Sequence, residues 1–337
     1  MAFSEILGHQ RQVQVIQRSL DRDRLHHAYL FIGPEGVGKK KVALSLAAAV
    51  HCSGMRGDSC GRCNDCRQVI EGNHPDVRLV EPEAGKREIT IQQIRNLQRM
   101  LGFRSFSGKK KVAIIDSARL MNYHAQNSLL KTLEDPPGDA LLILLDHSTG
   151  GLLTTVVSRC LRLYFPQLSV EQVARILTLE RGMGEEEATL LAAVTGGSLG
   201  EALSANGKEL ISRRRDWLQR YLSLSRRDFR AAMALAEDLG RDREKATAFV
   251  RWMKDWYRDI LFLQMGCTGE LIKNKDMVQA LGEMAPTLSL DQTLSVLERL
   301  ERVAGNLQKN YNGRLVMEEF ILGRWLNASR RNPQPAI

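Results

Sequence analysis

The chain has 337 residues, of which 43% are hydrophobic and 26% are charged, and its formal net charge is +9. This length exceeds what one hydrophobic core usually organises, so we expect two or three domains. The sequence has no apolar run long enough to span a bilayer and no signal-like N-terminus, which argues against a membrane or secreted protein and predicts a cytoplasmic location. The positive charge suits proximity to DNA, although scattered charges are equally compatible with a solvated surface.

Short apolar runs alternate with helix-period segments through the first half of the chain. The apolar runs are 28–32, 76–80, 112–116, 140–145 and 161–165, and the helical segments include 42–50 and 128–134. Continuous apolar strands between helices predict a parallel sheet covered on both faces. Thr90 and Asn122 are predicted to cap the starts of two helices, and Asp135, followed by two prolines, to end the second.

Beyond Pro166 the sequence predicts helices alone. Ser169 and Gln172 have capping-box spacing, and an acidic segment at 185–187 opens the next helix, so residues 167–207 are expected to form a small helical lid. Longer helices follow from residue 208. Their apolar stripes are expected to pack in a core, and the stripes contain Phe249, Trp252, Trp256, Ile260 and Leu263, then Leu294, Leu297, Leu300, Ala304 and Leu307.

The first apolar run leads into a phosphate-loop pattern, Gly33-Pro34-Glu35-Gly36-Val37-Gly38-Lys39-Lys40, which a helix follows. Glycines let backbone N–H groups face inward, and the N-terminus of the helix favours anions. Lys39 would then reach the phosphates of ATP. The predicted nucleotide-binding residues are Gly33, Gly36, Gly38, Lys39, Lys40 and Asp116. A loop that keeps this shape but binds nothing remains an alternative.

The hydrolytic parts of this motif are replaced. Position 40 is Lys where Ser or Thr normally ligates Mg²⁺, and one cation does not coordinate another. Asp116 ends an apolar strand as a Walker B aspartate does, but Ser117 stands where a glutamate would activate water. The sequence therefore predicts a nucleotide pocket that does not hydrolyse ATP.

Four cysteines, Cys52, Cys60, Cys63 and Cys66, fall within one short polar segment. Thiolates at this spacing can surround one tetrahedral ion and leave no position for water, which predicts a structural zinc. A disulfide framework is disfavoured in a cytosolic chain, and the alternatives are unrelated buried cysteines and a redox or iron–sulfur role. The two other cysteines are expected to be ordinary buried thiols: Cys160 and Cys267.

Taken together, these features resemble the clamp-loader AAA+ subunits of bacterial DNA polymerase III. The matching segments are 27–39, the four cysteines, 112–137, 152–160, 196–203 and 306–324. The resemblance implies an α/β AAA+ domain over 1–166, with a RecA-like parallel sheet, a P-loop and a zinc module at 52–66. It further implies that 167–207 form the lid and that 208–337 form an all-α collar domain. In this family the Ser-Arg-Cys motif places an arginine finger on ATP held by the adjacent subunit, which implies that role for Arg159.

Two further departures favour the delta-prime type over the gamma/tau motor. Gly200 stands where the lid of a motor carries an arginine, and Asp146 stands nearest to the expected phosphate-sensing Thr or Ser. The resemblance implies gamma/tau and delta subunits as partners, together with the sliding clamp and, through the assembled complex, primer-template DNA.

Two rival functions remain open from the sequence. One is a self-sufficient gamma/tau-type ATPase, and the other is a zinc-ribbon protein that binds nucleic acid directly, although no aromatic residue lies among the cysteines to stack on bases. We identify no pair of carboxylates suited to nucleotidyl transfer. A DNA-directed DNA polymerase or nucleotidyltransferase label would therefore belong to the holoenzyme.

Overall fold

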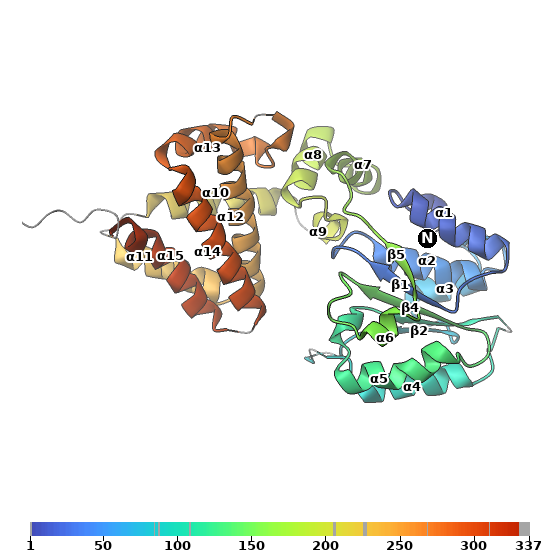
Figure 1. Ribbon diagram of the computed structural model, residues 1–337. Helices are drawn as coiled ribbons and strands as arrows, with labels where there is room; N and C mark the ends of the chain where they lie inside the picture. Colours follow the sequence, from blue (N-terminus) through green and yellow to red (C-terminus); the bar gives the residue numbers. More distant parts are fainter. Residues whose placement is uncertain are drawn as a thin grey trace, which may run out of the picture. The chain divides into compact units, whose positions relative to one another are not determined.

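The computed structural model describes residues 2–83, 85–86, 88–107, 109–204, 207–224, 228–267, 269–309 and 311–329. The chain divides into two compact units, which are Met1–Ala188 with Gly197–Ser204 and Thr189–Gly196 with Ala205–Ile337 (Figure 1). The first unit is built around a sheet. The described part of the second unit is helical.

A five-stranded parallel sheet forms the centre of the first unit, in the spatial order β2-β3-β4-β1-β5. The strands are β1 (Ala28–Ile32), β2 (Val77–Val80), β3 (Lys111–Ile115), β4 (Ala140–Asp146) and β5 (Leu161–Tyr164). Strands β1, β3 and β4 are buried throughout, as predicted. The edge strands β2 and β5 are less buried than predicted: Arg78 is exposed in β2, and Leu161 and Tyr164 are exposed in β5.

Helices cover the two faces of the sheet, and alternate residues of each strand serve one face or the other. Tyr29 and Phe31 pack on the first face, and Leu30 and Ile32 on the second. The first face carries η1 (Phe3–Glu5), α1 (Gln10–Asp21), α2 (Lys39–His51) and α3 (Asn64–Glu71); the second carries α4 (Ile91–Gly102), η2 (Ala118–Leu120), α5 (Tyr123–Glu134) and α6 (Thr154–Val157). This layering leaves the carboxyl ends of the strands free to form a site.

The predicted helix caps are confirmed. The Thr90 side chain accepts a hydrogen bond from the Gln93 N–H in a full capping box, and the Asn122 side chain caps α5 by accepting a hydrogen bond from the Ala125 N–H. Ser169 and Gln172 form the capping box of α7 (Val170–Arg181). Two helices follow, α8 (Glu185–Val194) and α9 (Leu199–Ser204).

The second unit packs its helices around one apolar cluster that includes Phe249, Trp252, Trp256 and Ile260, as predicted. The helices are α10 (Gly207–Ser223), α11 (Phe229–Gly240), α12 (Arg243–Gln264), η3 (Gly269–Leu271), η4 (Lys275–Met277), α13 (Val278–Met284), η5 (Ala285–Thr287), α14 (Leu290–Gln308) and α15 (Gly313–Ser329). Leu294 is an exception to the predicted stripe, since it lies in the first turns of α14 and is 42% exposed.

Two smaller findings complete the fold. Cys160 is buried as predicted, but Cys267 is only partly buried, because it follows the end of α12 in a turn. Among the residues that the structure describes, no helix is both long enough and apolar enough to cross a membrane.

Candidate functional site

The loop between β1 and α2 has the backbone geometry of a phosphate loop. Gly36 and Gly38 have φ angles of +75° and +105°, in the left-handed region that favours glycine. A Cβ at Gly33 would lie 2.1 Å from the carbonyl oxygen of Phe165, so a side chain does not fit there. The loop borders a cavity of about 450 Å³ whose other lining residues include Asp116, Ser117, Arg119, Asp146, Leu199 and Gly200.

The two lysines after the loop point to different partners. Lys39 Nζ donates hydrogen bonds to the carbonyl oxygens of Gly33 (2.6 Å) and Pro34 (2.7 Å). Burial lowers the pKa of Lys39. Lys40 Nζ instead forms ion pairs with Glu81 and, at 3.5 Å, with Asp116. Burial alone would lower the pKa of Lys40, but its hydrogen bond to Glu81 and the attraction of both carboxylates outweigh burial and raise that pKa.

Asp146, at the end of β4, is buried and already partnered. Its carboxylate accepts a hydrogen bond from the Arg119 backbone N–H and lies 3.7 Å from the Arg119 guanidinium and 3.1 Å from His147. Burial raises the pKa of Asp146. Arg119 also pairs with Glu35 of the loop at 3.1 Å. Asp146, which the sequence places where a phosphate-sensing Thr or Ser is expected, thus belongs to a salt-bridged cluster at the cavity wall.

Gly200 touches the loop directly. Its N–H donates to the carbonyl oxygen of Gly36 at 2.7 Å, and a Cβ at position 200 would lie 2.9 Å from the Gly36 Cα. Ser198 Oγ reaches the carbonyl oxygen of Glu35 at 3.4 Å. The start of α9 therefore rests directly on the loop, and Leu199 and Gly200 line the same cavity as the loop does.

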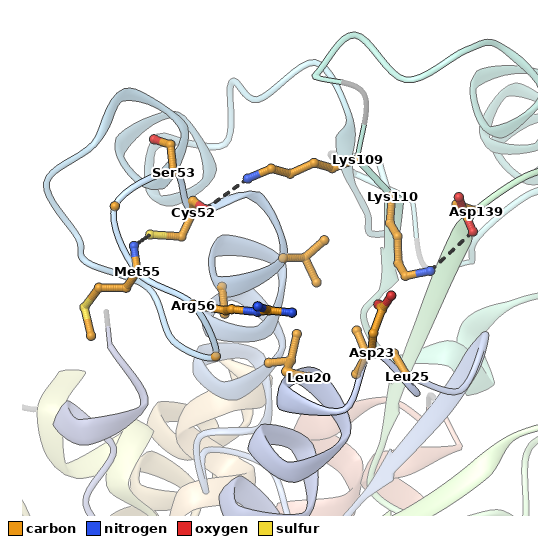
Figure 2. Close-up of a pocket in the computed structure, with 14 residues that line it drawn as sticks. Leu20, Asp23, Leu25, Cys52, Ser53, Met55, Arg56, Lys109, Lys110 and Asp139 are labelled. Carbon is orange, nitrogen blue, oxygen red and sulfur yellow. Dashed lines mark hydrogen bonds and ion pairs between the residues drawn. The ribbon is translucent and has the colours of Figure 1, made fainter.

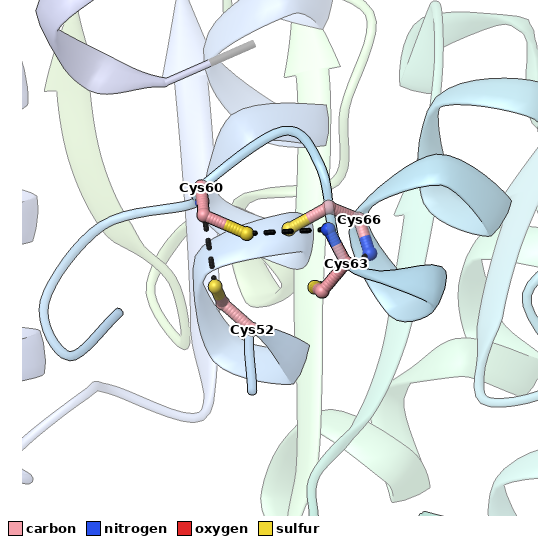
Figure 3. A group of neighbouring side chains, drawn as sticks. All are labelled: Cys52, Cys60, Cys63 and Cys66. Atoms are coloured by element: carbon pink, nitrogen blue, oxygen red, sulfur yellow. Dashed lines mark hydrogen bonds between the residues drawn. The ribbon is translucent and has the colours of Figure 1, made fainter. Parts of the chain in front are cut away.

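The four clustered cysteines converge at the end of α2 and the start of α3 (Figure 3). One sulfur from each of Cys52, Cys60, Cys63 and Cys66 lies within 4.8 Å of the others, so the group could hold a metal ion. Backbone N–H groups already point at the sulfurs, for example from Cys60 to Cys52 Sγ and from Cys63 to Cys60 Sγ, both at 3.3 Å. Burial opposes ionisation of Cys63, but hydrogen bonds from Cys66 and Ser53 outweigh it and lower its pKa to about 6. The donor set suits a thiophilic ion.

Sequence analysis missed the support behind this cluster. Lys109 Nζ donates to the carbonyl oxygens of His51 and Cys52, both at 2.9 Å, and so caps the C-terminal end of α2. Figure 2 shows Lys109 reaching Cys52 at the edge of a second cavity, of about 630 Å³. Lys109 belongs to the segment between α4 and β3, 57 residues from Cys52, and a basic residue in a loop carries no sequence signal for this contact.

Asp76 fixes that same segment. Its buried carboxylate accepts hydrogen bonds from the backbone N–H groups of Phe106 (2.9 Å) and Ser107 (2.8 Å) and from the hydroxyls of Ser105 and Ser107, and it lies 3.4 Å from Lys111 Nζ. Asp76 also lies close to the buried His51 and His74 in a group with possible metal-ligand atoms. Because five donors already surround the carboxylate, we assign Asp76 a structural role.

Arg159 lies apart from the nucleotide-like cavity, in the turn between α6 and β5. Its guanidinium pairs with Glu134 at 2.6 Å and donates to the carbonyl oxygen of Thr155 at 2.9 Å, while the side chain remains 35% exposed. Arg159 is absent from the described lining of the cavity. Arg159 therefore lies outside the described lining of the cavity that holds the predicted nucleotide-binding residues.

Comparison with known proteins identifies the family. Models described as "DNA polymerase III, delta subunit" and "DNA polymerase III, delta subunit, C terminal" match residues 8–169 and 208–325. The DNA polymerase III subunit delta' of Pseudomonas aeruginosa is 32% identical over 89% of this chain and 91% of its own. The chain belongs to this delta-prime family. A Bacillus subtilis member of the family is 31% identical over 93% of this chain and 94% of its own.

Tau and gamma subunits match a smaller part of the chain. The tau subunit of Escherichia coli is 34% identical, but the match covers 62% of this chain and 33% of tau. Among solved structures, a gamma subunit-related protein of Thermotoga maritima has a TM-score of 0.51 at 18% identity and covers 92% of this chain and 97% of its own. That likeness concerns the fold alone, and with the family matches it confirms the predicted fold class, an α/β AAA+ sheet followed by helical domains.

Proposed function

We propose that this chain acts in the cytoplasm as a non-hydrolysing subunit of a clamp loader and supplies Arg159 to ATP bound by the neighbouring subunit. The observation that carries the proposal is a contrast in position. Lys40 lines the cavity and pairs with Glu81 and Asp116, whereas Arg159 lies outside the described lining, where its partly exposed guanidinium pairs with Glu134. A guanidinium is always charged and can fork onto phosphate oxygens, which suits it to act on a nucleotide that another chain holds.

The proposed partners are gamma/tau and delta subunits, which would join this chain through a collar formed by residues 208–337. Residues 1–166, with the lid at 167–207, would lie against the neighbouring AAA+ domains. The complex as a whole would open the sliding clamp and place it on primer-template DNA. Nothing in this role requires the chain to be a polymerase or an efficient ATPase.

We also propose that the four cysteines hold one structural Zn²⁺. Cys52, Cys60, Cys63 and Cys66 offer four thiolates, and a shell of four sulfurs leaves no open position for catalysis. The segment between Cys52 and Cys63 has few apolar residues, so metal binding would provide most of its folding free energy.

The proposal is tested by mixing the chain with gamma/tau and delta subunits of its own organism and measuring DNA-stimulated ATP hydrolysis. Arg159→Ala should leave assembly intact and lower turnover at the site it serves by about a thousandfold, as for other arginine fingers. Arg162→Ala removes another exposed arginine nearby, and Glu134→Gln removes the ion pair of Arg159 but keeps its guanidinium. Both control variants should retain hydrolysis.

Two outcomes would contradict the proposal. Unchanged turnover in the Arg159→Ala complex would remove the finger assignment. Steady ATP hydrolysis by the isolated chain, abolished by Lys39→Ala, would favour the alternative of a self-sufficient gamma/tau-type motor.

A further inference from the structure

Three charged side chains meet where a divalent metal stands in a hydrolytic P-loop protein. Lys40 is the second residue of α2, Glu81 follows β2, and Asp116 follows β3. The Lys40 ammonium bridges the two carboxylates, with 3.5 Å between Lys40 Nζ and Asp116. Burial raises the pKa of Asp116, and the attraction of Lys40 opposes that rise. The Lys40 ammonium, a single monovalent cation, thus already pairs with both Glu81 and Asp116.

A magnesium ion does not fit at the position of the Lys40 ammonium, between Glu81 and Asp116. Mg²⁺ requires oxygen ligands in a near-octahedral arrangement, and a P-loop offers it a hydroxyl at the position that Lys40 occupies. An ammonium has three donors and no acceptor, so it cannot be a ligand and would repel the ion at contact distance. The residues present therefore disagree with the metal that the fold family implies.

Lys39 and the backbone of the loop remain available to bind a phosphate group. In the part of the chain that the structure describes, Lys39 forms no ion pair, since its Nζ bonds only the carbonyl oxygens of Gly33 and Pro34. The cavity of about 450 Å³ falls in the usual range for small-molecule sites. Lys39 and the curled backbone can thus meet a phosphate group without displacing an existing salt bridge.

We infer that Lys40 takes the place of the divalent metal, so that this cavity accepts a nucleoside polyphosphate free of Mg²⁺ in preference to its Mg²⁺ complex. The inference rests on the proposed loss of hydrolysis and deepens it. With a fixed ammonium in place of an exchangeable ion, the site can hold a nucleotide as a structural ligand but has no metal to activate its γ-phosphate.

The test uses the purified full-length chain and a fluorescent ADP analogue, with binding followed by anisotropy. The buffer is freed of divalent cations by resin rather than by EDTA, which would also withdraw zinc from the cysteine cluster. The native chain should bind the analogue, and excess MgCl₂ should weaken binding severalfold. Lys40→Thr restores the hydroxyl of the motif and should reverse this preference, so that Mg²⁺ strengthens binding. Lys40→Arg keeps a cation and should behave as the native chain does.

Lys39→Ala should abolish binding in both buffers and so locate the ligand at this loop. Thermal unfolding of each variant checks that it is folded. The inference is overturned if the native chain binds only with Mg²⁺, if it binds no analogue in either buffer, or if Lys40→Thr responds to Mg²⁺ as the native chain does. Because no partner subunit is present, each of these outcomes leaves the Arg159 assignment to its own test.

Discussion

The two ends of helix α2 differ in whether their charged or metal-binding groups already have partners within the chain. At its start, Lys39 and Lys40 are already matched within the chain, by backbone carbonyls in one case and by carboxylates in the other. At its end, Cys52 joins Cys60, Cys63 and Cys66 in a group whose sulfurs lie within 4.8 Å of one another. One helix thus links a loop that carries a lysine at the usual metal position to a cluster of cysteines that could hold an ion. The difference teaches that the chemistry of a motif depends on which of its groups remain unsatisfied.

The largest effect on stability should come from substitution of a cysteine in the cluster at the C-terminal end of α2. Cys66→Ser removes a ligand that is fully buried, and the free energy of zinc binding in such sites is on the order of 10 kcal/mol. We expect loss of about one zinc per chain by elemental analysis and rapid proteolysis within residues 53–62. Cys267→Ser is the matched control and should keep its zinc. Zinc-free native protein with full protease resistance would contradict a structural metal.

A smaller loss of stability should follow when Asp76 is replaced, because Asp76 holds the segment that carries Lys109. Asp76→Asn leaves several buried donors without a charged acceptor, so we expect a loss of about 3 kcal/mol in urea unfolding at neutral pH. Asp139→Asn, at an exposed ion pair with Lys110, should change stability by less than about 1 kcal/mol. Equal losses in the two variants would argue against a special role for Asp76.

The same carboxylate predicts a pH dependence. Burial alone would raise the pKa of Asp76, but the donors of Phe106, Ser107 and Ser105 outweigh burial and hold this pKa well below its usual range. A depressed pKa in the folded state stabilises the fold above the unfolded value of about 4, and this contribution is lost as the pH falls further. The native chain should therefore lose more stability than Asp76→Asn between neutral pH and about pH 3. Parallel pH profiles would contradict the assignment.

Substitution of Lys40, at the phosphate-loop end of α2, should change the stability of the chain only slightly. Lys40→Met removes a partly exposed bridge to Glu81 and Asp116, and such pairs contribute about 1 kcal/mol or less. We expect thermal unfolding to shift by only a few degrees. Lys41→Met, which breaks the pair with Glu180, is the matched control. A loss as large as that of Cys66→Ser would mean that Lys40 holds the fold rather than the pocket.

The smallest expected effect is at a cysteine outside the cluster. Burial raises the pKa of Cys160 to about 12, so this thiol should stay protonated and react with iodoacetamide more slowly than Cys267. Mass spectrometry of the partly labelled zinc-bound chain measures the order. Early labelling of Cys160 would show that the turn beside Arg159 opens readily.

Local patterns in the sequence predicted many of the helices and strands of the fold. Thr90 and Ser169 predicted helix starts because a cap depends on residues three apart, and the buried strands were recognisable from their apolar runs. The exposure of Leu294 and of β5 depends on which surfaces meet, which periodicity does not encode. Likewise, the absence of a hydroxyl at Lys40 was evident, but its pairing with Glu81, 41 residues away, required the parallel sheet to bring two strand ends together.

The contact between Gly200 and Gly36 limits which side chains fit at the start of α9. A Cβ at position 200 would stand 2.9 Å from the Gly36 Cα, so an arginine placed there would push the lid off the loop before it could reach a phosphate. Restoring Thr at position 40 and Glu at position 117 would not remove this obstacle. An arginine at position 200 would therefore require a backbone shift of the loop or of α9, in addition to the side-chain changes at positions 40 and 117.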